Sequence, residues 1–362
     1  MGTKPVKSLC KLKAVILVGG PGTRLQPLTF TLPKPIVPVV NHPFLEHTIT
    51  HLKQFGVAEI ILAMSYLPEK ILEYFGDGER FGVRLIYCVE KEPLGTAGAV
   101  KNAAAYLDTP FVVLNGDDVF LEMDLYEVCR FHREKKAKAT IFLTQVKNPS
   151  AFGVVETDEN GWVQRFIEKP PPGTETTNWI NAGGYLLEPE VLEYIPESQH
   201  YMFEKGLFPA LLEAGEPIYS YHYQQYWIDM GTLNNYFRLN MDILESKAST
   251  PLVARAGRIG VRCGPNVNVH PSAEITAPAV IDRGCRFGRD TRVKGPVVIG
   301  RDCIVEDGAR LENSILWDNV QVGASARLSN CIISSRVIID IGREIANCVV
   351  TPAQSAPLPP QR

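Results

Sequence analysis

The sequence lacks the features that mark membrane proteins and nucleic-acid-binding proteins. Its 362 residues contain no run of 18 or more apolar residues, so no membrane-spanning helix is expected. Lys and Arg number 37 against 40 Asp and Glu, and the formal net charge of -3 gives no global basic field. We therefore expect neither a nucleic-acid partner nor a membrane partner.

The composition also excludes large-scale disorder. Hydrophobic residues make up 45% of the chain and charged residues 21%, whereas disordered chains are poorer in apolar residues and carry more net charge. At about 150 residues per domain, the length suggests two or three domains.

Closely spaced cysteines are missing as well. The 8 cysteines are scattered, and no two have the C-x-x-C spacing, so neither a disulfide scaffold nor a zinc site is expected. No apolar signal core precedes Lys13, and residues 1–12 are interpreted as an N-terminal extension. The expected location is a reducing cytoplasm.

Residues 13–246 alternate between strand patterns and helix patterns. Short apolar runs at 14–18, 59–64, 83–89 and 111–114 are separated by helical stretches at 43–55, 68–75 and 97–107. This order predicts an α/β domain with a Rossmann-like, open, mixed but mostly parallel sheet and helices on both faces. Residues 152–166 add a predicted hairpin, and later stretches predict a helix over 204–214 and a strand over 218–227.

The period changes after Ser246. Large apolar residues recur every six positions, at Val269, Ile275, Ile281, Phe287, Val293, Ile299, Val305 and Leu311. Such hexads predict a C-terminal left-handed β-helix of hexapeptide repeats over 266–350, with a linker at 247–265. Three hexads per coil would stack residues 18 apart, which places Cys285 over Cys303 in an inward-facing row of small side chains. Residues 351–362 hold four prolines and no period, and they are expected to form a flexible tail.

The first predicted strand leads into Gly19-Gly20-Pro21-Gly22-Thr23-Arg24-Leu25-Gln26-Pro27-Leu28-Thr29 and then Pro33-Lys34-Pro35. Ligands of open α/β sheets bind at the carboxyl ends of strands, and glycines let backbone N–H groups approach phosphates. Arg24 and Lys34 add positive charge. A plain tight turn is the alternative, and it would suit a lone Gly-Gly better than this longer pattern. No Gly-Lys-Ser/Thr follows, and G-x-G-x-x-G is absent, so neither a Walker A loop nor a nicotinamide site is favoured.

Together with later motifs, this stretch resembles the sugar-1-phosphate nucleotidyltransferases. The later motifs are Leu94-Gly95-Thr96-Ala97-Gly98, Asn115-Gly116-Asp117, Phe166-Ile167-Glu168-Lys169-Pro170, Asn181-Ala182-Gly183-Gly184 and Trp227-Ile228-Asp229-Met230-Gly231-Thr232. The resemblance covers about residues 13–245, and a hexad domain is a common C-terminal partner in this family.

The resemblance implies an enzyme that joins a nucleoside triphosphate to a hexose-1-phosphate. The sugar phosphate would attack the α-phosphate in line, with Mg²⁺ assisting, to give a nucleotide sugar and pyrophosphate. Leu-Gly-Thr-Ala-Gly is most like the guanylyltransferases of mannose-1-phosphate, which favours GTP and the product GDP-mannose. The thymidylyl, uridylyl and adenylyl branches, which act on glucose-1-phosphate, stay open.

The same resemblance assigns the catalytic and metal-binding residues. Arg24 and Lys34 would hold the triphosphate, and Asp117 and Asp229, each at a strand end, would bind Mg²⁺. Asp117 could instead cap a following helix, and the role of the adjoining Asp118 stays open.

The remaining assignments concern the nucleotide and the sugar. The expected nucleotide-binding residues are Leu17, Val18, Gly19, Gly20, Gly22, Thr23, Glu90, Gly95 and Thr96. Lys169 would bind the sugar phosphate, Glu168 and Asn181 the sugar hydroxyls, and Gly153 would leave room for the sugar.

Two other classes of function occur among chains of this architecture. Some chains of this architecture are non-catalytic regulatory subunits, but such chains tend to lose the charged residues that are retained here. Others are acyltransferases that use a histidine of the hexad domain, and His270 alone does not favour that reading. The flat faces and open ends of a β-helix favour a homo-oligomer, a dimer or higher, with contacts through this domain.

Overall fold

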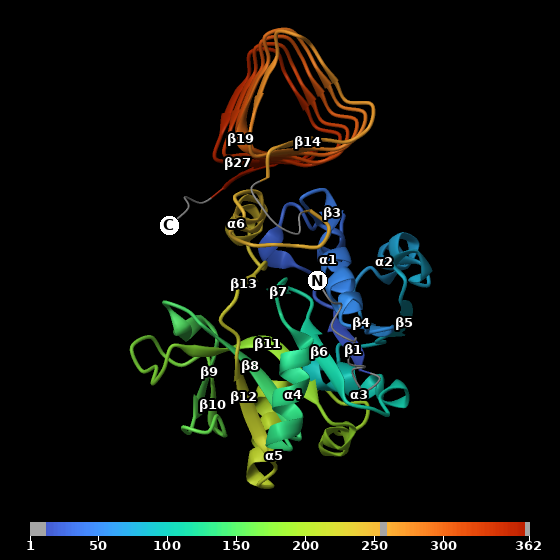
Figure 1. The fold of residues 1–362 in the computed structure, drawn as a ribbon, viewed down its shortest axis with the longest axis vertical. Coiled ribbons are helices and arrows are strands. Elements are labelled where there is room, and N and C mark those ends of the chain that lie inside the picture. Colours follow the sequence, from blue (N-terminus) through green and yellow to red (C-terminus); the bar gives the residue numbers. More distant parts are fainter. Residues whose placement is uncertain (1–11, 254–258, 359–362) are drawn as a thin grey trace, which may run out of the picture. The chain divides into compact units, whose positions relative to one another are not determined.

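The computed structural model describes residues 12–253 and 259–358, which form two compact units (Figure 1). The first unit contains residues 12–20 and 48–227, and the second contains 21–47 and the described residues from 228 onwards. The signature segment is therefore divided, because Gly19 and Gly20 belong to one unit and the residues from Pro21 onwards to the other. Residues 1–11, most of the predicted N-terminal extension, lie outside the described residues.

A mixed sheet forms the core of the first unit. Its strands are β1 (Lys13–Leu17), β4 (Glu59–Met64), β5 (Arg84–Val89), β6 (Phe111–Asn115), β8 (Ala139–Gln145), β9 (Gly153–Thr157), β10 (Val163–Glu168), β11 (Trp179–Leu187) and β12 (Ile218–His222). Strands β5, β4, β1 and β6 run parallel in that order, and β11 joins β6 in the antiparallel sense. The near-continuous apolar sequence of β1 and β4 fits strands that are covered on both faces.

Helices connect these strands, as the alternating pattern predicts. They are α1 (Phe44–Gln54), α2 (Pro68–Phe75), α3 (Gly95–Asn102), α4 (Leu125–Lys135) and α5 (Phe208–Glu213). Asp124 caps α4 by accepting hydrogen bonds from the N–H groups of Tyr126 and Glu127. The helix after β6 therefore begins at Leu125, and the short strand β7 (Asp118–Phe120) follows Asp117 directly. Asp117 is not a helix cap.

Two elements of the first unit differ from the sequence-based expectation. The helix expected over 204–214 starts with a π-helical turn at Phe203–Leu207 before α5. The strand expected over 218–227 stops at His222, and a second strand, β13 (Trp227–Asp229), begins five residues later. The side chain of Tyr223 is buried and its hydroxyl donates to the carbonyl of Tyr226, which closes a turn that a period-2 pattern does not reveal.

The second unit joins the signature loop to the C-terminal part of the chain. It contains the short strands β2 (Pro38–Val39) and β3 (His42–Pro43) and helix α6 (Leu233–Leu244), which Thr232 caps. Tyr236 of α6 is buried and donates to the carbonyl of Pro38, while its hydroxyl accepts from the indole N–H of Trp317. Through Tyr236, the segment that follows the signature loop is bonded to the hexad domain.

The hexad domain is a parallel β-helix whose coils are visible in Figure 1. Its strands are β14 (Val261–Cys263), β15 (Asn268–Val269), β16 (Glu274–Thr276), β17 (Ala279–Ile281), β18 (Arg286–Phe287), β19 (Arg292–Ile299), β20 (Ile304–Val305), β21 (Arg310–Leu316), β22 (Gln321–Val322), β23 (Arg327–Ser329), β24 (Ile332–Ile333), β25 (Ile338–Ile339), β26 (Glu344–Ala346), β27 (Cys348–Val350) and β28 (Ser355–Pro357).

The number of residues between stacked strands confirms the predicted hexapeptide repeats. Arg286 pairs with Ile304, which is 18 residues on, and Ile304 pairs with Gln321, which is 17 residues on. The one-residue slip in the hexads is therefore a shortening of the coil. Cys285 and Cys303 are both fully buried free thiols in the core of the β-helix.

The end of the described chain departs from the expected flexible tail. β28 pairs with β27 in the antiparallel sense, and Leu358 is buried. Backbone hydrogen bonds and one apolar anchor hold this segment, and neither requires hexad periodicity. Among the residues that the structure describes, no helix has the length and apolar character needed to cross a membrane.

Candidate active site

The first part of the signature segment lies at the carboxyl end of β1. The N–H of Val18 donates to the carbonyl of Ala63, and the carbonyl of Leu17 accepts from the N–H of Gly116. At Gly19, a Cβ would lie 2.9 Å from the hydroxyl of Ser65, whereas at Gly20 a Cβ would meet nothing within 4 Å. Gly19 is thus required by packing, and Gly20 leaves open space at the strand end, where ligands of such sheets bind.

The Leu94–Gly98 motif packs tightly against residues 199–203. The N–H groups of Ala97 and Gly98 both donate to the carbonyl of Tyr201, and a Cβ at Gly95 would lie 2.7 Å from that same oxygen. The hydroxyl of Thr96 accepts from the N–H of Phe203. The motif therefore fixes a backbone junction, and its glycines are explained by close packing.

Glu90 stands at the end of β5, beside this junction. Its Oε2 accepts from the N–H of Leu94 at 3.0 Å, and burial raises the pKa of its carboxyl. One carboxylate oxygen of Glu90 orients the turn at Leu94. Glu90 thus positions the Leu94–Gly98 motif, which contains the predicted nucleotide-binding residues Gly95 and Thr96.

The two neighbouring aspartates after β6 have different surroundings. Asp118 accepts a hydrogen bond from Asn115 Nδ2 at 3.1 Å, and its carboxylate fills the space where Gly183 lacks a side chain. Gly183 has φ +80°, so a side chain there would be strained as well as blocked. Asp118 is thus engaged in packing the strand ends. The Oδ1 of Asn115 is buried with no hydrogen-bond partner among the described residues.

The predicted sugar-binding residues Gly153, Glu168 and Lys169 lie together. Glu168 pairs with Gly153 across the β9–β10 hairpin, and a Cβ at Gly153 would lie 3.0 Å from Glu168 Oε2. Lys169 ends the hairpin with φ +46°, and its Nζ lies 3.4 Å from Glu168 Oε1. Non-glycine residues rarely adopt a positive φ, and those that do are enriched at functional sites. The hairpin thus presents an acceptor and a cation side by side.

Asn181 belongs to a partly buried polar group that includes Glu204, a residue that the sequence analysis did not identify. Asn181 Nδ2 lies 2.8 Å from the hydroxyl of Tyr185 and 3.4 Å from Glu204 Oε1. Burial raises the pKa of Glu204, and the charge of Glu168 raises it further. The other oxygen, Glu204 Oε2, is buried without a hydrogen-bond partner among the described residues.

Glu204 lies in the π-helical turn before α5. Such turns occur often at functional sites. In the sequence, Glu204 carries no signal beyond being an acidic residue within a helical pattern.

Arg24 and Asp229 form an ion pair in the second unit. Arg24 Nη1 lies 3.2 Å from Asp229 Oδ2, and the N–H of Gly231 donates to Asp229 Oδ1 at 2.6 Å. The side chain of Arg24 is 59% exposed and that of Asp229 only 13%. Gly231 must lack a side chain because a Cβ would overlap the Arg24 guanidinium. The Gly231-Thr232 pair of the Trp-Ile-Asp-Met-Gly-Thr motif thus holds Asp229, makes room for Arg24 and caps α6.

The rest of the signature loop is also ordered locally. Gly22 adopts φ +64°, and its carbonyl accepts from the hydroxyl of Thr29. Thr23 and Lys34 each begin a short 3₁₀ turn, and the side chain of Lys34 is buried. Lys34 is thus a buried cation, in contrast to the exposed guanidinium of Arg24.

Comparison with known families decides the class of protein. Residues 13–246 match the family model described as nucleotidyl transferase, and residues 260–355 match the GMPPB C-terminal domain. The chain belongs to the nucleotidyl transferase family. This membership confirms the resemblance inferred from the motifs, and the nucleotidyltransferase carries the hexad domain that the sequence predicts.

Curated relatives align over most of this nucleotidyltransferase. A UTP--glucose-1-phosphate uridylyltransferase from Synechocystis is 35% identical, covering 86% of this chain and 84% of the relative. A mannose-1-phosphate guanylyltransferase from Mycobacterium tuberculosis is 38% identical, covering 83% and 82%. A probable mannose-1-phosphate guanylyltransferase 3 from Oryza sativa is 39% identical, covering 86% and 82%.

Solved structures match the nucleotidyltransferase over 63% of its length. A putative glucose-1-phosphate thymidylyltransferase from Bacillus anthracis has a TM-score of 0.57 at 26% identity and is covered over 94% of its chain. HddC from Yersinia pseudotuberculosis complexed with GMP-PN has a TM-score of 0.55 at 30% identity and is covered over 98%.

The predicted site residues are distributed over both units. The first unit holds Leu17, Val18, Gly19, Gly20, Glu90, Gly95, Thr96, Asp117, Gly153, Glu168, Lys169 and Asn181, and the second holds Gly22, Thr23, Arg24, Lys34 and Asp229. Within the described residues, no three His, Cys, Asp or Glu side chains form a metal-binding cluster.

Proposed function

We propose that this nucleotidyltransferase joins a nucleoside triphosphate and a hexose-1-phosphate into a nucleotide sugar, with release of pyrophosphate. The relatives that align over most of the chain are named for this reaction class. The observation that carries the proposal is the Arg24–Asp229 pair held by Gly231, because two segments 205 residues apart combine a cation and a carboxylate. The retention of such charged groups speaks for catalysis over a non-catalytic regulatory role.

Both substrates are polyanions, so the protein must position them and offset their charge. We assign Lys34 and the loop from Gly19 to Thr23 to the triphosphate, with Arg24 at the charge that develops on the leaving pyrophosphate. Glu90, Gly95 and Thr96 would shape the place of the base and ribose, together with Leu17 and Val18. Lys169 would hold the attacking sugar phosphate against the α-phosphate, while Glu168 and Asn181 would contact sugar hydroxyls beside Gly153.

Asp117 and Asp229 are the residues proposed to hold Mg²⁺. The donor set fits this ion, which takes few protein oxygens and completes its shell with water and phosphate oxygens. When bound, Mg²⁺ would neutralise charge on the α-phosphate. Asp229 Oδ2 faces Arg24 in the structure, so Mg²⁺ bound at this oxygen would compete with the guanidinium for it.

We propose GTP and mannose-1-phosphate as the substrate pair. The guanylyltransferases of Mycobacterium and Oryza match at 38% and 39% identity, and HddC was solved with GMP-PN. The uridylyltransferase of Synechocystis, at 35% identity, keeps UTP and glucose-1-phosphate as the second candidate.

The test is a matrix of the four nucleoside triphosphates and the two hexose-1-phosphates, each with Mg²⁺, in which pyrophosphate release is measured. We expect the highest kcat/KM for GTP with mannose-1-phosphate. A higher value for UTP with glucose-1-phosphate would move the assignment to the uridylyl branch.

Two further predictions accompany this function. The flat faces and ends of the β-helix favour a homo-oligomer, which sedimentation of the full chain would detect as a mass above 40.1 kDa. A cytoplasmic location also stays a prediction, and the free thiols of Cys285 and Cys303 are compatible with a reducing compartment.

A further inference from the structure

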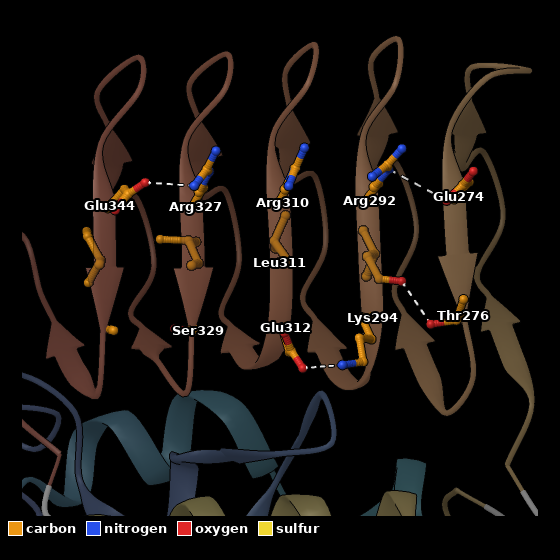
Figure 2. A pocket seen from close by; sticks show the side chains of 14 residues that line it. Glu274, Thr276, Arg292, Lys294, Arg310, Leu311, Glu312, Arg327, Ser329 and Glu344 are labelled. Carbon is orange, nitrogen blue, oxygen red and sulfur yellow. Dashed lines mark hydrogen bonds and ion pairs between the residues drawn. The ribbon is translucent and has the colours of Figure 1, made fainter.

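A row of charged side chains runs across one face of the β-helix, and none of its residues is assigned to the active site. The strands β16, β19, β21, β23 and β26 lie side by side, and the first residue of each contributes to the row (Figure 2). In order along the row, these residues are Glu274, Arg292, Arg310, Arg327 and Glu344. The parallel register sets each of them opposite the next.

The three arginines of this row are not matched by three carboxylates. Arg292 lies 3.7 Å from Glu274, and Arg327 lies 3.1 Å from Glu344. Arg310 stands between the two other arginines and, among the described residues, has no carboxylate at ion-pair distance. Neighbouring strands are about 4.8 Å apart, and like charges directly opposite each other destabilise a sheet. The central arginine therefore costs stability unless an anion lies against it.

The row forms one wall of a groove of about 530 Å³. The opposite wall consists of Thr276, Lys294, Glu312, Ser329 and Ala346. Lys294 and Glu312 neutralise each other, with Nζ 2.5 Å from Oε1. Beyond this pair, Ser329 and Ala346 are short side chains, so the groove is open opposite Arg327, whereas Glu312 lies two residues from Arg310 on the same strand. Its lining holds four cationic side chains against three carboxylates.

We propose that this groove binds a small anion that carries two or more phosphate groups, centred on Arg310. A guanidinium group matches phosphate oxygens with two parallel hydrogen bonds, and the neighbouring arginines repeat this fork at about 4.8 Å. The proposal goes beyond the catalytic function, because none of the groove residues belongs to the proposed active site.

The glutamates at the two ends of the row restrict the ligand. Three arginines span about 10 Å, and a longer polyanion such as nucleic acid would meet Glu274 at one end and Glu344 at the other. A second copy of the chain packed face to face about a two-fold axis centred on Arg310 would set arginine against arginine. A short ligand suits the charge pattern better than either.

The test uses inorganic pyrophosphate as the probe, titrated calorimetrically into the full chain without divalent metal. Wild type should bind pyrophosphate at the groove in addition to any binding at the active site. Arg310→Gln should weaken the groove binding about tenfold or more, the loss expected for a charge-assisted bidentate contact. The matched control is Arg286→Gln, which removes an exposed arginine from β18 on another sheet of the β-helix and should leave the isotherm unchanged.

Hydrogen exchange of wild type with pyrophosphate should show added protection in β19, β21 and β23. Identical isotherms for wild type and Arg310→Gln would overturn the proposal, because all binding would then lie elsewhere. An equal loss in Arg286→Gln would also overturn it, because the effect would then reflect general charge and not this groove. Both outcomes are independent of whether the chain turns over GTP and mannose-1-phosphate.

Discussion

At the scale of single residues, different roles are proposed for the two adjacent carboxylates after β6. Asp118 is held by Asn115 and fills the space over Gly183, whereas Asp117 is the proposed metal ligand. We expect Asp117→Asn to lower kcat by 10²-fold or more and to raise the Mg²⁺ concentration needed for half-maximal rate. Asp118→Asn, the matched control, should keep the Mg²⁺ requirement of wild type. Equal Mg²⁺ titration curves for the two variants would contradict the assignment.

Glu204 accepts a hydrogen bond from Asn181, so the loss of Glu204 should weaken binding of the sugar phosphate. Without the Oε1 acceptor, the amide of Asn181 and the hydroxyl of Tyr185 lose their common partner. We expect Glu204→Ala to raise KM for the hexose-1-phosphate about tenfold and to leave KM for the nucleotide unchanged. Glu204→Gln retains an acceptor and should restore most of the affinity. A parallel rise in both KM values would show a general structural role.

These residues also show what can be predicted from sequence. The motifs identify Asp229, Glu168 and Asn181 because each stands within a string of unusual neighbours. Glu204 has no such neighbours, and its importance depends on contacts with Asn181 and Tyr185, about 20 residues away along the chain. The role of Asp118 likewise depends on a glycine of β11, which only the folded sheet brings close.

At the scale of elements, His47 ties α1 to the ends of two other segments. Its Nε2 donates to the carbonyl of Val39 at 2.9 Å, and its Nδ1 lies 2.7 Å from the hydroxyl of Thr250. Complete burial lowers the pKa of His47 from 6.5 to about 4. The folded state therefore requires the neutral imidazole, while the unfolded chain takes up a proton near pH 6.5.

The stabilisation by His47 is thus fully present above pH 6.5 and is lost as pH falls from 6.5 to about 4. The shift corresponds to about 3 kcal/mol. We expect His47→Gln to destabilise the protein more at pH 7 than at pH 4.5, as measured by denaturant unfolding. The same loss of unfolding free energy at both pH values would contradict the neutral, buried histidine.

Regular elements were predicted well where one period dominates. The bounds of β4 and α2 agree with the sequence-based ranges because a continuous apolar run and an amphipathic stretch after Pro68 leave no competing pattern. The strand expected over 218–227 was wrong in its middle, since its alternating aromatics continue through the turn that Tyr223 closes. Segment 355–357 was missed because antiparallel pairing to β27 needs no hexad signal.

At the scale of the whole molecule, the hexad domain is bonded to the segment that follows the signature loop. Tyr236 of α6 donates to Pro38, four residues after Lys34, and accepts from Trp317 of the β-helix. These bonds lie in a buried environment, which also raises the pKa of the Tyr236 phenol. The hexad domain therefore helps to fix the segment that follows Lys34, one of the proposed catalytic residues.

We expect Tyr236→Phe to lower the free energy of unfolding by about 1–3 kcal/mol, because the Trp317 N–H and the Pro38 carbonyl stay buried without their partner. Trp317→Phe should lower the free energy of unfolding less, because the hydrogen bond from Tyr236 to the Pro38 carbonyl remains. The double variant should show a coupling energy of about 0.5 kcal/mol or more. Additive effects of the two substitutions in denaturant unfolding would show that the bond between loop and β-helix contributes nothing.

All the roles proposed for the active-site residues depend on nucleotidyl transfer itself. The most direct measurement follows GTP, mannose-1-phosphate, pyrophosphate and GDP-mannose together in one reaction with Mg²⁺, for wild type and for Asp229→Asn. The account predicts equal amounts of pyrophosphate and GDP-mannose from wild type, and no turnover by a folded Asp229→Asn protein. Equal turnover by Asp229→Asn, or no nucleotide sugar from wild type with any pair in the substrate matrix, would contradict it.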